Sequence, residues 1–190
     1  MPLSICVYCS SSSAVDGVYR DATRELGRLI SARGHTLVYG GGTPGLMGDL
    51  ARAVKAGGGR VLGVIPRRLA EFGLGYAEAD HLLVTETMGE RKALMIEHAN
   101  AYVALPGGFG TLEEILEVIT LKQLEYLRGP IVLLNTGGFY EPLLAHFERL
   151  YEERFARPEY RALYHVAAEP ADALDHIEGY RETALPKKWI

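Results

Sequence analysis

Short apolar segments alternate with segments of helical character along most of this 190-residue chain. The apolar runs predict strands at residues 3–9, 35–39, 60–65, 82–85, 101–105 and 131–134, with a short seventh strand at 165–168. The segments between them predict helices at residues 16–33, 46–56, 88–99, 111–127, 140–154 and 171–180. This alternation is typical of a parallel sheet with helices on both faces. The sequence therefore predicts an α/β fold, a Rossmann-like doubly wound parallel sheet of six to seven strands.

The length favours one domain over residues 1–190, with a loose tail at 185–190. The composition, 48% hydrophobic and 23% charged, is ordinary for a globular protein. A formal net charge of −4 gives no sign of a nucleic-acid surface. No apolar run approaches the roughly 20 residues that span a bilayer, and the first residues do not resemble a signal peptide. We expect a cytoplasmic protein without nucleic-acid or membrane partners.

The two cysteines, Cys6 and Cys9, have a C-x-x-C spacing that could indicate a redox pair or a metal site. Both fall in the first predicted strand, where residues three apart point to opposite faces. The six histidines are scattered along the chain. We therefore expect neither a disulfide nor a metal site.

Three loops rich in glycine or serine follow predicted strands, at residues 9–13, 40–45 and 106–111. Parallel sheets bind ligands outside the carboxyl ends of their strands, so these loops should converge on one site. Glycine allows a ligand to approach backbone amides closely, which suits a phosphate. The loops match neither G-x-G-x-x-G nor a P-loop, which disfavours a dinucleotide-dependent or ATP-hydrolysing enzyme.

The third loop leads into the longest predicted helix. Thr111 is placed to act as the helix N-cap, and Glu114 has the spacing of a capping box. The alternative is that this is a tight turn with an ordinary cap and no ligand.

A helical wheel of residues 88–99 places two cations, Arg91 and Lys92, on the side that should be buried. Buried cations need a partner, so either both extend along an apolar edge to water or they meet an anion in a cleft. We favour the cleft.

The wheel of the long helix gives a main apolar stripe that contains Leu116 and Tyr126, and a second patch around Val118 and Leu121 on its back. A helix that is apolar on two sides is buried on two sides. The second patch predicts contact with another subunit, with Glu114 near that seam.

Two complete motifs support a family resemblance. Pro-Gly-Gly-x-Gly-Thr-x-x-Glu occurs at residues 106–114, and Met-x-x-Arg-Lys occurs at residues 88–92. With these motifs the sequence resembles, over residues 5–150, the Lonely Guy (LOG) family of cytokinin-activating phosphoribohydrolases. Serine at position 10 and the segment at 69–73 depart from the family pattern, which bears on base preference.

The resemblance implies hydrolysis of the N-glycosidic bond of N6-modified adenosine 5′-monophosphates, and of AMP, to the free base and ribose 5-phosphate. It implies Arg91 and Glu114 as the catalytic pair, water as co-substrate, no cofactor and a homodimer or higher homo-oligomer. The candidate substrate contacts are Lys92, Gly107, Gly108, Gly110, Thr111, Glu113, Met88, Ser10, Gly41 and Gly42.

Two other functions are considered. One is a non-catalytic nucleotide carrier or sensor of the same fold, in which Arg91 and Glu114 would serve binding alone. The other is lysine decarboxylation, a label attached to some similar sequences, which requires pyridoxal phosphate on a lysine. Lys92 adjoins an arginine and fits anion binding better than a Schiff base.

Overall fold

The computed structural model describes residues 1–182 and 186, and its centre is a seven-stranded parallel sheet in the order β4-β3-β2-β1-β5-β6-β7. The strands are β1 (Ser4–Tyr8), β2 (Thr36–Tyr39), β3 (Arg60–Pro66), β4 (His81–Thr85), β5 (Ala101–Ala104), β6 (Ile131–Leu134) and β7 (His165–Ala167). The predicted parallel sheet, with all seven strands, is confirmed. The expected tail lies outside the described residues except for Pro186.

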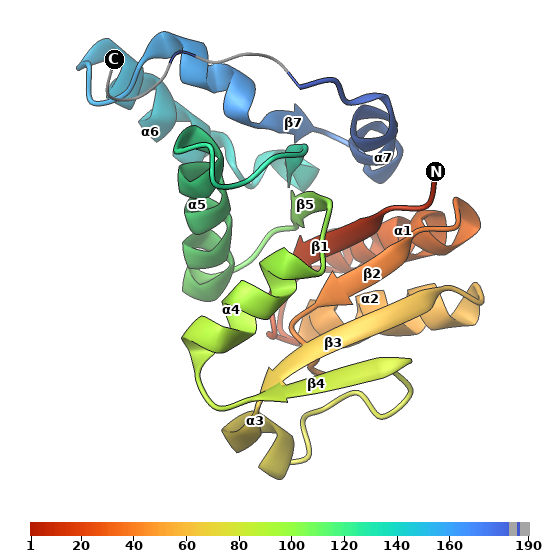
Figure 1. Cartoon of the computed structure of the whole chain (residues 1–190). Coiled ribbons are helices and arrows are strands. Elements are labelled where there is room, and N and C mark those ends of the chain that lie inside the picture. Colours follow the sequence, from red (N-terminus) through yellow and green to blue (C-terminus); the bar gives the residue numbers. More distant parts are fainter. Residues whose placement is uncertain (183–185, 187–190) are drawn as a thin grey trace.

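Helices cover both faces of the sheet (Figure 1). On one face lie α1 (Gly17–Ala32), α2 (Gly45–Ala56) and α7 (Pro170–Gly179). On the other lie α4 (Met88–Glu97), α5 (Phe109–Gln123) and α6 (Glu141–Glu152), with the 3₁₀ helix η2 (Pro158–Leu163). The short elements α3 (Arg67–Glu71) and η1 (Thr136–Gly138) follow β3 and β6. Two apolar cores therefore flank the sheet, as expected for a doubly wound fold.

The order of the strands reverses at β1, which pairs with β2 on one side and with β5 on the other. Ligands of open α/β sheets bind at such a switch point, outside the carboxyl ends of the strands. The loops after β1 and β2 meet there, because the amide of Leu46 donates to the carbonyl of Ser10 over 3.0 Å. A β-carbon at Gly45 would lie 2.4 Å from the carbonyl oxygen of Ser12, so this contact requires glycine. The predicted convergence of these two loops is confirmed.

The orientation predicted for α5 is wrong in part. Val118 is fully buried in the core between α5 and the sheet, whereas Leu116 is 38% exposed and Tyr126 is 81% exposed. The wheel assumed one continuous helix to residue 127, but α5 ends at Gln123, so Tyr126 lies beyond it. The apolar surface left on α5 is therefore formed by Leu116 and Phe109.

The two cysteines lie on opposite faces of the sheet and are free thiols. Cys6 belongs to the core beneath α4 and α5, and Cys9 packs against the core beneath α1 and α2. The sheet therefore separates the two thiols.

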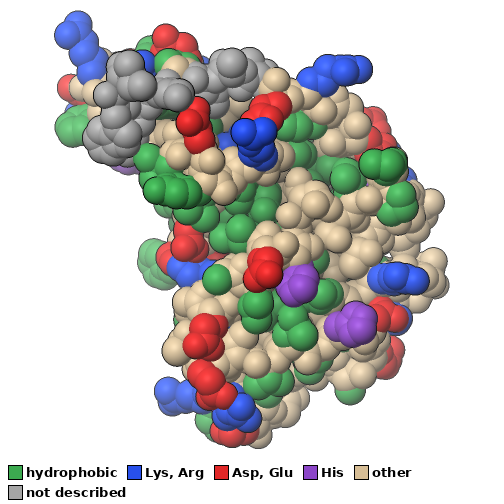
Figure 2. All heavy atoms as spheres, viewed as in Figure 1, with side chains coloured by type: hydrophobic (Ala, Val, Ile, Leu, Met, Phe, Trp, Pro, Cys, Tyr) green, Lys and Arg blue, Asp and Glu red, His purple; other side chains and the backbone are tan. Residues whose placement is uncertain are grey.

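Charges are dispersed over the surface. On the face drawn in Figure 2, basic side chains are interleaved with acidic ones and form no continuous basic field. Among the helices of residues 1–182, none is both long and apolar enough to cross a bilayer.

Candidate active site

An ion pair between two helices forms the centre of the site. Arg91 of α4 donates from Nη1 to Oε1 of Glu114 on α5 over 2.6 Å, and the two side chains are only 10% and 9% exposed. The Nε of Arg91 also donates to the carbonyl oxygen of Val64 in β3, over 3.1 Å. The guanidinium is thus fixed between a helix and the sheet. The predicted inward orientation of Arg91 is confirmed, and its anionic partner is a carboxylate of the same chain.

The start of α4 is set by a capping box. The side chain of Thr87 accepts from the amide of Glu90 over 3.1 Å, and the Glu90 carboxylate accepts from the amide of Thr87 over 3.3 Å. This box fixes the rotation of the first turn, so the next residue, Arg91, points toward the sheet.

Gly40, in the loop after β2, makes room for the arginine. A β-carbon at this position would fall 2.0 Å from Nη2 of Arg91. Gly41, its neighbour, has a φ of +72°, a conformation that favours glycine. Sequence reasoning selected Gly41 and Gly42 and missed Gly40, although all three belong to one triglycine run. The glycine run is visible in the sequence, but the sequence does not show that the guanidinium of Arg91 lies against Gly40.

The environment of Glu114 alters its acidity. Burial raises the pKa of this carboxyl group above its ordinary value, and the charge and hydrogen bond of Arg91 oppose the increase. The site therefore holds a carboxylate that is shielded from water and contacts a cation, an arrangement able to stabilise positive charge on a bound ligand.

Lys92 and Glu113, both predicted to contact substrate, pair with each other. The ammonium of Lys92 contacts the carboxylate of Glu113 and lies 3.0 Å from Oε2 of Glu117. These two carboxylates raise the pKa of Lys92, with the hydrogen bond to Glu113 as the largest cause. A second bridge between α4 and α5 therefore lies beside the Arg91–Glu114 pair.

The capping box predicted for α5 is wrong. The N-cap is Gly108, without a side-chain cap, and the helix begins at Phe109, so Thr111 is already in the first turn. Glu114 cannot cap the helix because its carboxylate binds Arg91. The glycines at 107 and 108 allow the helix to begin at Phe109, earlier than the start predicted from Thr111 as N-cap.

The side chain of Thr111 is buried against Gly107, where a β-carbon would fall 2.1 Å from its hydroxyl oxygen. Leu112 donates the first hydrogen bond within α5, to the carbonyl of Gly108. The amides of Phe109, Gly110 and Thr111 precede that bond, and no side chain caps them. This uncapped helix start is the kind of site that binds a phosphate.

The remaining predicted residues lie at the start of α4 and in the loops that follow β1 and β2. Met88 is half exposed at the start of α4, and Ser10 accepts a hydrogen bond from the amide of Ser12 over 3.0 Å. Tyr140, which pattern analysis did not select, donates from its hydroxyl to the carbonyl of Leu105 over 2.7 Å. It thereby holds the end of β5 from which the glycine turn departs.

No group of three or more His, Cys, Asp or Glu side chains in the described part of the chain is arranged to hold a metal ion. The site itself presents a buried carboxylate, a guanidinium and a row of backbone amides.

Comparison with protein families and curated proteins gives consistent matches over most of the chain. A family model described as "Possible lysine decarboxylase" matches residues 47–177. A "Probable cytokinin riboside 5′-monophosphate phosphoribohydrolase" of Oryza sativa subsp. japonica is 42% identical over 176 residues, which cover 93% of this chain and 72% of that protein. A "Cytokinin riboside 5′-monophosphate phosphoribohydrolase" of Arabidopsis thaliana is 41% identical over 190 residues, covering 97% and 89%.

Solved structures with the same fold are more distant in sequence. The molybdenum cofactor binding protein of Rippkaea orientalis has a TM-score of 0.72 at 20% identity, covering 94% of this chain and 96% of that one. The molybdenum cofactor carrier protein of Chlamydomonas reinhardtii has a TM-score of 0.70 at 24% identity, covering 94% and 97%. At this level of identity, the likeness shows the fold alone.

Proposed function

The chain belongs to the Lonely Guy family of cytokinin riboside 5′-monophosphate phosphoribohydrolases, and from this premise we propose how its own residues carry out that reaction. The enzyme hydrolyses the N-glycosidic bond of a cytokinin riboside 5′-monophosphate and releases the free base and ribose 5-phosphate. We assign the catalytic roles to Arg91 and Glu114.

Cleavage of the bond between ribose and base develops positive charge on the sugar, as in glycoside hydrolysis. Glu114 stabilises this charge or orients the attacking water, and its burial strengthens the interaction because little solvent screens it. Arg91 keeps Glu114 ionised against the cost of burial and fixes the direction of the carboxylate. Neither role requires a cofactor.

The 5′-phosphate binds at the start of α5. The uncapped amides there and the positive end of the helix dipole favour an anion. We assign this contact to Gly107, Gly108, Gly110 and Thr111, with Lys92 lining the same pocket. A phosphate held at this point would position the ribose beside Glu114, which lies one turn further along the helix.

The remaining substrate contacts that we assign belong to the loops and helix starts on the same rim: Met88, Ser10, Gly41, Gly42 and Glu113. The serine at position 10 and the segment after β3 distinguish this chain from the family pattern, and we place the selection of the base there.

We further propose that the enzyme accepts AMP as a substrate beside its N6-modified derivatives. The enzyme works in the cytoplasm as a homodimer, and the exposed side chains of Phe109 and Leu116 on α5 support an interface at this helix. One chain of 190 residues forms a single nucleotide-binding domain.

One observation carries the catalytic assignment: the buried contact between Arg91 and Glu114 lies beside an uncapped helix start. The test incubates purified protein with AMP and with N6-isopentenyl-AMP and follows the free base by chromatography. Glu114→Gln keeps the shape of the side chain and removes its charge, so base release should fall by at least about a hundredfold. Glu97→Gln, an exposed change at the end of α4, is the matched control and should retain activity.

Adenosine, which lacks the phosphate, should react poorly because the anchoring interactions are absent. If the protein binds AMP but the wild type releases no base, the hydrolase assignment fails and the carrier alternative takes its place. If Glu114→Gln retains full activity, the protein is still a hydrolase but Glu114 is not its catalytic carboxylate.

A further inference from the structure

A second cavity, of about 440 Å³, lies at the opposite end of the sheet from Arg91 and Glu114. Its wall includes Ile131 and His165, the first residues of β6 and β7, and it is closed by the ends of α5 and α7. The cavity has the volume of a site for a small organic molecule. Nothing in the hydrolysis described above uses it.

Lys122, in the last turn of α5, is the chemically unusual residue of this cavity. Its ammonium donates to the carbonyl oxygen of Leu163 over 3.0 Å and lies 4.8 Å from the centre of the Tyr180 ring. In residues 1–182 no carboxylate lies within ion-pair distance of it.

The other two described lysines have carboxylate partners. Lys55 lies 2.9 Å from Asp80, and Lys92 contacts Glu113 and Glu117. Lys122 is therefore the described lysine that has no carboxylate of residues 1–182 within ion-pair distance.

The surroundings favour the neutral amine. Burial lowers the pKa of Lys122 to about 8, whereas carboxylate partners raise the pKa of Lys92. Burial also lowers the pKa of His176, with further contributions from the nearby charges of His165 and Lys122. Lys122, His165 and His176 thus lie on one wall of the cavity. At mildly alkaline pH a large fraction of Lys122 is the neutral amine, which is the nucleophilic form.

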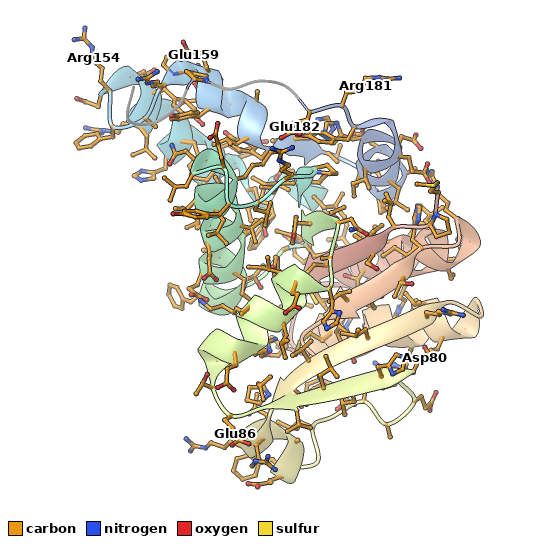
Figure 3. The ribbon with its side chains drawn as sticks, in the orientation of Figure 1. Asp80, Glu86, Arg154, Glu159, Arg181 and Glu182 are labelled. Atoms are coloured by element: carbon orange, nitrogen blue, oxygen red, sulfur yellow. The ribbon has the colours of Figure 1, made fainter. Side chains whose placement is uncertain are left out.

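The shape and charge of the cavity restrict what it can accept. The rings of His165 and His176 stack with centroids 4.1 Å apart and planes 5° apart, which gives a flat aromatic surface. Asp175 lines the cavity, and the charge of Glu182 acts on Lys122. Arg181 also lines the cavity, and the end of its side chain is directed outward in Figure 3. The stacked rings favour a flat molecule at this wall.

We propose that the cavity captures a small, flat aldehyde covalently on Lys122. The neutral amine attacks the carbonyl carbon, a C–N bond forms, and the carbonyl oxygen takes a proton to give a carbinolamine. Loss of water then leaves an imine between Lys122 and the ligand. His176 lies on the same wall and can accept and return the proton.

Pyridoxal, which is flat and lacks a phosphate, is a suitable probe. The full-length protein is incubated with pyridoxal and cyanoborohydride between about pH 7 and pH 9, and the labelled lysines are identified by peptide mass spectrometry. Labelling of Lys122 should exceed that of Lys55 and Lys92 by at least about tenfold near pH 8. Its rate should rise with pH to a midpoint near the pKa of about 8.

Two further measurements separate binding in the cavity from simple amine reactivity. Pyridoxine has the same ring without an aldehyde, and it should slow the labelling of Lys122 but not of Lys55. Lys122→Arg keeps the positive charge, cannot form the imine under these conditions, and should lose the label while releasing base from AMP at the wild-type rate.

Equal labelling of Lys122, Lys55 and Lys92 would overturn the proposal, as would a failure of pyridoxine to protect Lys122. Because the experiment detects a labelled peptide, its result does not depend on the proposed hydrolase activity.

Discussion

Gly40 lies against the guanidinium of Arg91, so close that a β-carbon would fall 2.0 Å from Nη2. The guanidinium cannot move away without loss, because its Nε and Nη1 donate hydrogen bonds to the carbonyl oxygen of Val64 and to the carboxylate of Glu114. A residue without a side chain at position 40 is therefore part of the catalytic arrangement that we propose.

Gly40→Ala should displace Arg91 and lower kcat for AMP by at least about tenfold, because small errors in position are costly in catalysis. Steady-state kinetics measures the effect, and a thermal melt shows whether the variant folds. Gly179→Ala is the control, since a β-carbon at Gly179 meets no atom within 4 Å. A folded Gly40→Ala protein with wild-type kcat would show that the position of Arg91 does not matter.

The pH dependence of kcat/KM should show the raised pKa of Glu114. Burial shifts this pKa upward, so the carboxyl group holds its proton at a higher pH than an ordinary glutamate. Activity that needs the carboxylate is then lost as pH falls through a midpoint above 4.5, the ordinary value. A pH–rate profile in buffers of constant ionic strength measures it, and an acidic midpoint at or below 4.5 would contradict the prediction.

Lys92→Met should raise KM for AMP by roughly threefold to tenfold, a modest effect because Glu113 and Glu117 already balance much of the charge. Lys55→Met removes a lysine that pairs with Asp80 and serves as control. Figure 3 places Asp80 at the end of β4 away from Glu86 and α4. A lower kcat with unchanged KM would instead mean that Lys92 only ties α4 to α5.

Leu116→Glu should convert a dimer to a monomer by placing a charge on the exposed face of α5. Light scattering after size exclusion measures the mass. Val18→Glu, a similar change at an exposed apolar residue of α1 on the other face, should leave the mass unchanged. If the wild type is itself a monomer, or if Leu116→Glu remains a dimer, the interface is not on this face.

Lys122 should make stability depend on pH. Its folded pKa is about 8 and the ordinary value is 10.5, so between these values the unfolded chain binds more protons than the folded one. The cost of burying the charge is fully present below about pH 8 and is relieved as pH rises toward 10.5. The Tm of Lys122→Met minus that of the wild type should therefore be larger at neutral pH than near pH 10. A difference that does not change with pH would show that burial does not destabilise the ammonium form of Lys122.

The sequence allowed the sheet, the helices and the rim of the site to be predicted because apolar periodicity and glycine turns are local properties. Arg91 and Glu114 could be selected because a cation on an apolar helix face is unusual and the motif at 106–114 is specific. The cap of α5 could not be predicted correctly from Thr111. The identity of the N-cap residue depends on where the backbone becomes helical. Gly107 and Gly108 allow several backbone conformations there, so the sequence does not fix this point.

Sequence alone thus determined the order of elements and the end of the sheet where the functional side chains gather, since both follow from short-range patterns. Only the tertiary structure decided that Arg91 contacts Glu114 beside Gly40, that Lys92 contacts Glu113 and that Leu116 faces outward. It also decided that Lys122 has no carboxylate of residues 1–182 within ion-pair distance. These facts depend on how segments far apart in the chain pack together, and packing is set by the shapes and charges of both surfaces at once.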